Sequence, residues 1–200
     1  MKIVKIETII NVGDLENSDL MRTITHHIET AIFSIENPLG GGSFILYPEK
    51  KGNGVKPIKH SFILKLQEFG WEPEAKIDLV VTTNRPGPID AAYPVNDKFF
   101  AVEWETGNIS SSHRAVNKII IGMLKGKLIG GVLILPSRKM YEYLTDRVGN
   151  YMELEPYFPV WKDANYNIQN GILKIIEIEH DGESQFVPKI PKGTDGRALR

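Results

Sequence analysis

The 200-residue sequence contains no cysteine. This absence excludes disulfides and thiolate metal sites, so oxygen and imidazole groups are the available side-chain metal ligands. Long apolar runs are missing as well, since runs such as IIIGML at residues 119–124 and VLIL at residues 132–135 are far too short to cross a bilayer. The N-terminal MKIVKIETII lacks a signal-peptide cleavage pattern. We therefore expect an intracellular, cytoplasmic protein without a membrane partner.

An excess of either charge sign is also absent, with a formal net charge of -1 that by itself argues against a nucleic-acid partner. The local balance differs. Residues 112–150 carry seven Lys and Arg against two acids, residues 151–183 reverse that balance, and residues 185–200 are basic again. Such blocks fit either a solvated surface or a face that binds a polyanion, and charge alone leaves both readings open.

Apolar periodicity divides the chain into alternating helices and strands after a first pair of helices. We predict helices over residues 18–35, 58–69, 111–125 and 137–149, the first capped by Asn17 or Ser18, and strands over residues 76–82, 99–105 and 128–135. The two strands around the Pro/Gly turn NRPGP favour a hairpin or meander. The order predicts one α/β domain over residues 1–200, with a central mixed sheet flanked by helices.

Two glutamates stand one residue apart at a strand end, in the stretch FAVEWETGNISSSHRAVNK of residues 100–118. Residues two apart in a strand point to the same face, so Glu103 and Glu105 project together while Trp104 faces the other way. Two carboxylates that close repel each other, so a positive group must lie between them or one must hold a proton. A hard divalent cation such as Mg²⁺ meets this need with oxygen ligands.

Asp90 supplies a third acid from the preceding strand, and Glu74 is placed to supply a fourth. Asp followed by Glu-x-Glu is a layout for metal-assisted phosphodiester cleavage. By spacing alone a solvated Glu-x-Glu face is the more common case, but the basic residues Arg114, Lys118 and Arg147 follow, as a site that binds phosphate requires. A glycosidase pair would flank a sugar from separated positions instead.

The runs VEWETGNISSSHRAVNK, YLTDRVGNYMELEPYF and VPKIPKGTDG, with GVKPIK and GPID before them, resemble the BamHI-type restriction endonucleases in order from about residue 53 to residue 196. The resemblance implies a restriction-endonuclease-like PD-(D/E)xK core, an α/β fold. It implies a Mg²⁺-dependent type II enzyme that cuts double-stranded DNA at the palindrome GGATCC after the first G, leaving 5′ overhangs and 5′-phosphates. The implied partners are a second copy of the chain and a cognate DNA methyltransferase.

Carried over residue by residue, the resemblance implies an active site of Asp90, Glu103 and Glu105, with Glu74 reached through a one-residue gap. It implies two metal ions, the main-chain carbonyl of Trp104 as a further ligand, and Glu105 as the general base. Lys59 in PIKH matches a lysine near the family's active site.

The same resemblance implies a major-groove set whose donors and acceptors suit base edges. Its members here are Asn108, Ser110, Arg114, Asp146 and Arg147. Without the family, the TDR of residues 145–147 would read as an ordinary ion pair at a helix C-terminus.

Further along, a flexible C-terminal arm at about residues 189–200 is implied to reach the minor groove through Asp195 and Gly196. Its Gly, Pro and basic composition predicts little order without DNA. A palindrome is most simply matched by a two-fold dimer, in which we expect the helices at residues 111–125 and 137–149 to pair. The rival hypothesis is a DNA-binding module that reads the site without cutting it.

Overall fold

The computed structural model describes residues 1–79, 87–145 and 147–192. Its helices are η1 (Leu15–Asn17), α1 (Asp19–Phe33), α2 (Lys56–Glu68), α3 (Ile109–Leu124), α4 (Arg138–Tyr141), α5 (Tyr151–Leu154), η2 (Glu155–Tyr157) and α6 (Phe158–Lys162). Its strands are β1 (Lys2–Val12), β2 (Ile45–Leu46), β3 (Glu72–Ala75), β4 (Ile89–Val95), β5 (Lys98–Trp104), β6 (Leu128–Pro136), β7 (Gly171–Glu179) and β8 (Gly182–Glu183).

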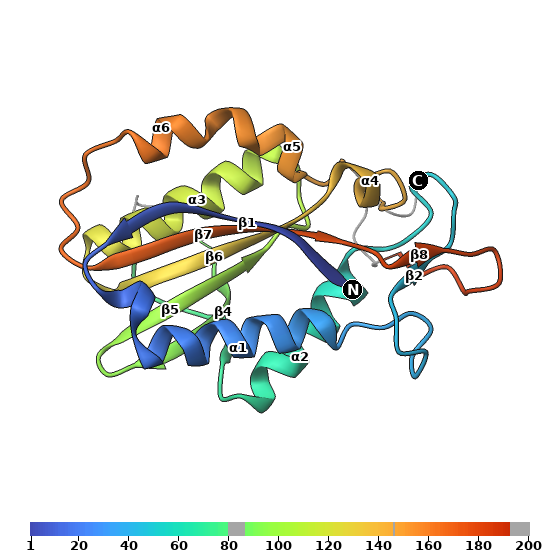
Figure 1. The fold of residues 1–200 in the computed structure, drawn as a ribbon, viewed down its shortest axis with the longest axis horizontal. Helices are drawn as coiled ribbons and strands as arrows, with labels where there is room; N and C mark the ends of the chain where they lie inside the picture. The colour runs from blue at the N-terminus through green and yellow to red at the C-terminus, as the bar shows by residue number, and fades with distance from the viewer. Residues whose placement is uncertain (80–86, 146, 193–200) are drawn as a thin grey trace.

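Six of the described strands form one mixed sheet in the order β1-β7-β6-β5-β4-β3. Strands β5, β6 and β7 run parallel, whereas β1, β4 and β3 pair antiparallel at the two sides. The helices α1 and α2 cover one face, and α3, α5 and α6 cover the other (Figure 1). The predicted α/β class, with a mixed sheet between helices, is confirmed.

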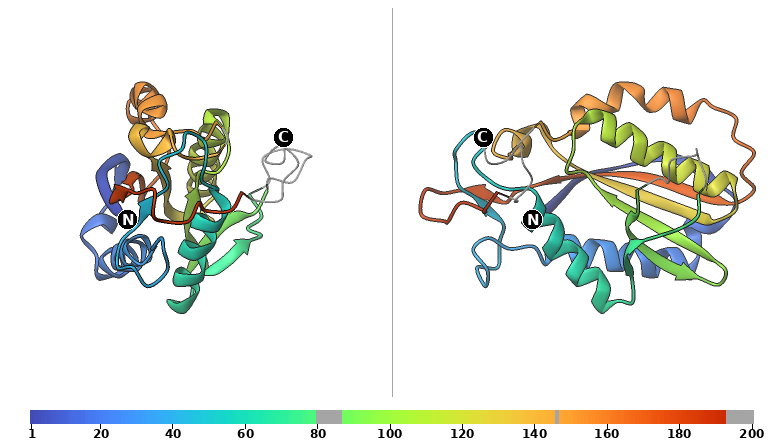
Figure 2. Two further views of the ribbon diagram at one scale, coloured as in Figure 1. Left: turned by 90° about the vertical axis from the view of Figure 1, so that its right-hand side faces the viewer. Right: turned by 180° about the vertical axis from the view of Figure 1, so that it is seen from behind.

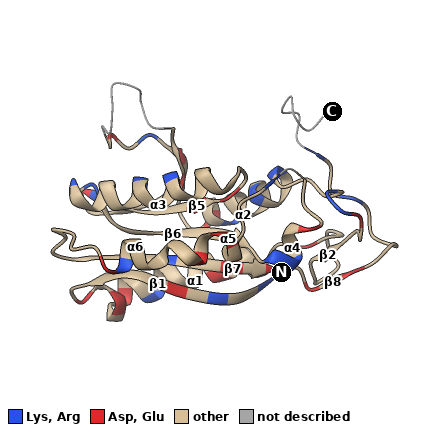
Figure 3. Ribbon diagram, turned by 90° about the horizontal axis from the view of Figure 1, so that it is seen from above, with Lys and Arg blue, Asp and Glu red and all other residues tan. Residues whose placement is uncertain are grey.

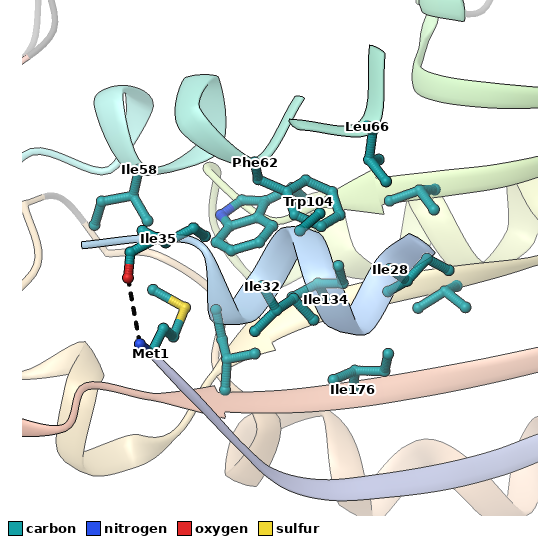
Figure 4. Close-up of a cluster of buried hydrophobic side chains, with 14 of the residues drawn as sticks. Met1, Ile28, Ile32, Ile35, Ile58, Phe62, Leu66, Trp104, Ile134 and Ile176 are labelled. Atoms are coloured by element: carbon teal, nitrogen blue, oxygen red, sulfur yellow. Dashed lines mark hydrogen bonds between the residues drawn. The ribbon is translucent and has the colours of Figure 1, made fainter. Parts of the chain in front are cut away.

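The central strands are apolar on both faces because both are covered by helices. In β6, Val132 and Ile134 belong to the core under α1 and α2, and Leu133 and Leu135 to the core under α3. Figure 4 shows the first core, where Ile28, Ile32 and Ile35 meet side chains of α2 and the sheet. In the described residues, no helix combines the length and the apolar character that crossing a bilayer requires.

The first two predicted helices are confirmed, and their ends follow from named residues. Ser18 caps α1, since its side chain accepts from the N–H of Met21 at 3.1 Å. Gly70, with a φ of 82°, follows the end of α2 in the left-handed conformation that glycine adopts most easily. The predicted meander is formed by β3, β4 and β5, with residues 84–88 in the connection between β3 and β4, whereas β4 and β5 turn at Asn96 and Asp97. The predicted strand at residues 128–135 is β6.

The strand predicted at residues 76–82 is wrong where it is described, since β3 ends at Ala75 and residues 76–79 form no strand. The physical reason is the partner: β3 pairs with the start of β4, and Ala75 already faces Ile89. Extending β3 would need a ladder past Pro88, which has no N–H. Residues 80–82 lie outside the described residues.

The helix predicted at residues 137–149 is also wrong, because α4 ends at Tyr141. Residues 143–145 pair with the backbone of Asn53 instead. The N–H of Asn53 donates to the carbonyl of Tyr143 at 2.9 Å, and the N–H of Thr145 donates to the carbonyl of Asn53 at 2.7 Å. These tertiary bonds occupy groups that a helix would have used. A helix at residues 137–149 is therefore not available for the predicted pairing across a dimer.

The predicted C-terminal arm is described only as far as Lys192, so Asp195 and Gly196 lie outside the described residues, as does Asp146. The start of that segment is held by the fold. Ile190 is buried, its carbonyl accepts from the N–H of Gly54 at 2.9 Å, and Lys189 pairs with Glu49. A flexible arm can begin only after these anchored residues.

Candidate active site

Two acids meet where β4 and β5 lie side by side. In the hairpin, Ala91 of β4 pairs with Val102 of β5, so the next residues along each strand are Asp90 and Glu103. The backbone N–H of Trp104 donates to Oδ2 of Asp90 at 2.8 Å. The antiparallel register therefore brings the Asp and the Glu-x-Glu together, although thirteen positions separate Asp90 from Glu103 in the sequence.

The two glutamates share a face, as the strand period predicts. Both are buried, and both contact α3: Lys118 binds Glu103, and the hydroxyl of Ser112 donates to Glu105. Trp104 points to the opposite side, where the centroid of its ring lies 4.8 Å from the ring centroid of Phe62 in α2. The prediction that Glu103 and Glu105 project together is confirmed.

Lysine side chains supply positive charge at this site. Lys59 of α2 forms an ion pair with Asp90. Lys118 of α3 forms one with Glu103 and also donates to the carbonyl of Pro88 at 3.1 Å. The predicted need for a positive group among the carboxylates is thus met here by ammonium groups from helices on both faces of the sheet.

Burial raises the pKa of Glu103 to about 7, and the ion pair with Lys118 opposes that rise. Burial likewise raises the pKa of Glu105 to about 7, against the hydrogen bond from Ser112. The N–H of Gly107 also donates to Oε1 of Glu105, at 2.6 Å. In both carboxyls burial outweighs the polar partners, so the charged form of each is held at a cost near neutral pH.

Glu74 is not brought into this buried cluster. It lies in β3 between Pro73, which pairs with Ala91, and Ala75, which pairs with Ile89. This register sets it on the strand beside Asp90, but its side chain is exposed and its backbone has a φ of 49°. Within the described residues, no group of three or more His, Asp or Glu side chains is arranged to hold a metal ion.

The donor chemistry nevertheless fits a hard cation. Asp90 and Glu103 offer carboxylate oxygens, and the raised pKa of Glu103 marks a buried carboxyl that a cation would stabilise in its charged form. Lys59 and Lys118 now provide that charge, so a metal ion would have to take over from at least one of these ammonium groups.

Four of the residues with implied base contacts are described, and all four are exposed: Asn108, Ser110, Arg114 and Arg147. The first three lie at the start of α3, where the Asn108 side chain accepts from the N–H of Ser110 at 3.1 Å. Arg147 is far away in sequence, but the N–H of Gly149 donates to the carbonyl of Gly107 at 2.8 Å. The fold therefore brings both segments to one end of α3.

Sequence reasoning missed the roles of Lys118 and Ser112 as partners of the two glutamates. Lys118 was evident only as one of several basic residues after the acids. Its position beside the buried stripe of α3, next to Ile119, is the signal that could have identified it.

The figures place α3 relative to the sheet. Basic residues recur along α3 in Figure 3, and α3 crosses the strands in the view from behind in Figure 2.

Comparison with known proteins gives consistent matches. The family model described as "Restriction endonuclease BamHI" matches residues 1–197. The type II restriction enzyme OkrAI of Oceanobacter kriegii is 52% identical over 200 residues, which is 100% of both chains. The type II restriction enzyme BamHI of Bacillus amyloliquefaciens is 32% identical over 193 residues, covering 93% of this chain and 87% of the relative.

A solved structure is similar as well. The crystal structure of the restriction endonuclease BglII complexed with a DNA 16-mer matches with a TM-score of 0.61 and 14% identity, covering 90% of this chain and 79% of that one. At this identity the likeness shows the fold alone, and it confirms the predicted restriction-endonuclease-like fold.

Proposed function

The chain belongs to the BamHI family of restriction endonucleases and is a type II, site-specific deoxyribonuclease, and we propose that it cuts double-stranded DNA at GGATCC after the first G, leaving 5′ overhangs and 5′-phosphates. Residues 1–200 act as one domain in this proposal. The observation that carries it is the pair of acids formed by the partly buried Asp90 and the buried Glu103, which meet across β4 and β5 beside the helix that presents the proposed base contacts.

Mg²⁺, two ions per site, is the proposed cofactor. Asp90, Glu103, the Trp104 carbonyl and, from β3, Glu74 would hold it. Bound Mg²⁺ supplies positive charge that lowers the pKa of a bound water and offsets charge on the scissile phosphate. Glu74 is the least constrained of these ligands, because its side chain is exposed while Asp90 and Glu103 are already held in place.

Glu105 is the proposed general base for the attacking water. A carboxyl with a pKa of about 7 is well matched to taking a proton near neutral pH. Ser112 and the N–H of Gly107 bind its two oxygens and so fix its orientation. Lys59 is proposed to contact DNA near the active site, where it also supports Asp90.

Specificity is proposed to come from the major-groove set named above, with Asp146 among its members, and from Asp195 and Gly196 in the minor groove. An arginine reads guanine through a two-pronged contact to N7 and O6, Asp accepts from cytosine N4, and Asn both donates and accepts. Exposure of Arg114 and Arg147 at one end of α3 is compatible with such contacts.

A homodimer is proposed because a palindrome presents two equivalent half-sites. Because residues 137–149 do not form the predicted helix, another contact surface is needed. The exposed apolar side chains on the side of α3, α5 and α6 support one. We define this surface by Leu124, Met152, Tyr157 and Val160, which are 46%, 64%, 47% and 67% exposed. The further proposed partner is a methyltransferase of the same restriction system, acting with the enzyme in the cytoplasm.

The rival hypothesis, a DNA-binding module that reads the site without cutting it, is wrong, because the chain belongs to a family of type II restriction enzymes. The acids Asp90 and Glu103 also argue against it, since a protein that only binds DNA would gain from losing negative charge beside phosphate. Plasmid DNA with a single GGATCC site, incubated with the protein and Mg²⁺, tests the proposed site and cofactor when the new ends are sequenced. Ends other than G/GATCC refute the proposed site, and no cleavage at any Mg²⁺ concentration refutes the proposed cofactor. A plasmid with that site mutated is the control.

A further inference from the structure

Asn53 is a fully buried polar residue, at 0% exposure, that joins chain segments far apart in sequence. Its backbone pairs with residues 143–145, donating to Tyr143 at 2.9 Å and accepting from Thr145 at 2.7 Å. This forms an isolated parallel bridge between Asn53 and Leu144. It is the same pairing that prevents a helix over residues 137–149.

The side chain of Asn53 adds three more bonds. Its Nδ2 donates to the carbonyls of Tyr47 at 2.9 Å and Tyr143 at 3.1 Å. Its Oδ1 accepts from the N–H of Ile190 at 3.3 Å. The amide thus uses its donors and its acceptor on three separate segments, which no apolar residue and no residue with only one kind of polar group could do.

Gly54 extends the contact to the C-terminal segment. Its N–H donates to the carbonyl of Ile190 at 2.9 Å. A Cβ on Gly54 would lie 1.9 Å from the carbonyl oxygen of Pro191, so only glycine allows this approach. Residues 189–191 are therefore fixed against residues 53–54 by backbone bonds, by the Asn53 amide and by close packing.

The segments that meet at Asn53 lead to proposed DNA contacts. Residues 143–145 continue to Arg147, and residues 189–191 continue toward the proposed minor-groove arm. In the other direction, α2 begins at Lys56 and carries Lys59 to its ion pair with Asp90. No direct DNA contact by Asn53 is needed, because it is buried beneath these segments.

We infer that Asn53 is a positioning residue for specificity, which fixes the segment leading to Arg147 and the root of the C-terminal arm relative to each other. The inference rests on the proposed function, in which both segments contact DNA. A loose junction would let each segment bind phosphate in several registers, and a contact to a base edge requires one register. Loss of Asn53 should then reduce discrimination between sites more than it reduces general DNA affinity.

The test measures binding in Ca²⁺ to a GGATCC duplex and to a duplex with the outer base pair changed, for wild type and Asn53→Ala. We expect the Kd for GGATCC to rise about tenfold in Asn53→Ala, because the segments that read bases lose their fixed register, with the Kd for the changed duplex nearly constant. Ile28→Ala is the control, since it destabilises a buried site in α1 and should leave discrimination intact. Equal discrimination by Asn53→Ala and wild type overturns the inference.

Gly54→Ala is the second variant, which decides the matter if Asn53→Ala does not fold. It should displace Pro191 and weaken specific binding in the full chain. In a chain that already lacks residues 194–200, the same substitution should leave binding unchanged. If Gly54→Ala weakened specific binding equally in the full and the shortened chain, the inference would be overturned. Arg147→Ala, measured alongside, separates this inference from the proposed function. If Arg147→Ala loses discrimination and Asn53→Ala does not, only the role of Asn53 is overturned. If neither variant loses discrimination, the proposed base contact of Arg147 is contradicted as well.

Discussion

Trp104 and Asp90 are joined by a backbone-to-side-chain bond: the N–H of Trp104 donates to Oδ2 of Asp90 at 2.8 Å. The other oxygen of Asp90 pairs with Lys59. Asp90 is therefore oriented by protein groups before any metal ion arrives. A variant that keeps the acceptor but loses the charge can separate the structural task of this residue from its proposed chemical task.

Asp90→Asn keeps an amide oxygen for the Trp104 N–H and removes the carboxylate charge, so it should fold and abolish cleavage. Glu103→Ala should abolish cleavage as well, and both variants should bind GGATCC as tightly as wild type or more tightly, since each loses a charge that repels phosphate. Cleavage is measured in Mg²⁺ and binding in Ca²⁺, whose looser geometry should support binding without turnover. Asp97→Asn, at the exposed far end of the same hairpin, is the control. Full cutting by Asp90→Asn or Glu103→Ala would contradict the proposed metal ligands.

Lys118→Met should lower the stability of the metal-free protein. Lys118 is only 17% exposed on its side chain and pairs with the buried Glu103. Breaking a buried pair costs about 3–5 kcal/mol, but protonation of Glu103 can relieve part of this, so a loss of roughly 1–3 kcal/mol is expected in thermal or urea unfolding. Lys127→Met, at an exposed position after α3, should change stability by less than about 0.5 kcal/mol. Equal stability of the two variants would show that the Lys118 pair is energetically silent.

Periodicity predicted the parts of the fold that local pattern decides. The stripe of α1, the apolar run of β6 and the shared face of Glu103 and Glu105 all follow from helix or strand geometry. The two wrong elements depend on partners distant in sequence. Residues 76–79 lack a ladder beyond β3, and residues 143–145 pair with Asn53, so pairing overrides local propensity in both places.

The candidate site divides in the same way. The acids could be named from spacing and resemblance, because their chemistry and sequence pattern are distinctive. The partners of Lys118 and Ser112 could not be named in the same way: the stripe of α3 marks Lys118 as facing the sheet, but which glutamate each residue reaches depends on the angle at which α3 packs on the sheet. Strands β1 and β7 were not predicted either, although β7 lies inside the sheet between β1 and β6 and is mostly buried.

Arg147→Ala tests base reading. Loss of a two-pronged guanine contact should cost about 1–3 kcal/mol per half-site, with discrimination at the contacted base pair lost first. Arg138→Ala removes another exposed arginine, in α4, and should leave discrimination unchanged. Competition binding against duplexes with each base pair changed measures the effect. If Arg147→Ala weakened GGATCC and its outer-pair variants equally, Arg147 would be a phosphate contact.

Val160→Glu tests the proposed dimer surface. Val160 is 67% exposed on α6, so a charge there should be tolerated by the monomer fold but strongly unfavourable if association buries it. We expect sedimentation velocity to show a monomer and double-strand cutting to fall with it. Leu39→Glu, at a 94% exposed loop position, is the matched control and should remain dimeric. A dimeric Val160→Glu protein would place the interface elsewhere.

The pH dependence of stability follows from the two buried glutamates. Burial raises the pKa of Glu103 and of Glu105 from 4.5 to about 7, so between these values the folded protein binds more protons than the unfolded chain. Stability of the metal-free protein should therefore fall as pH rises from about 4.5 to about 7 through these groups, and their full cost is present above that range.

Histidines act in the opposite direction, since burial lowers the pKa of His27 and His180 and stability rises with pH through their titration. The wild-type curve alone is thus a sum of opposing slopes. The difference between wild type and Glu105→Gln isolates one glutamate, and Glu103→Gln the other. As the pH rises from 5 to 8, the free energy of unfolding of each variant should increase relative to that of wild type by on the order of 1–3 kcal/mol, measured by urea unfolding in EDTA. A difference that stays constant with pH would show that the replaced glutamate has an ordinary pKa in the folded protein.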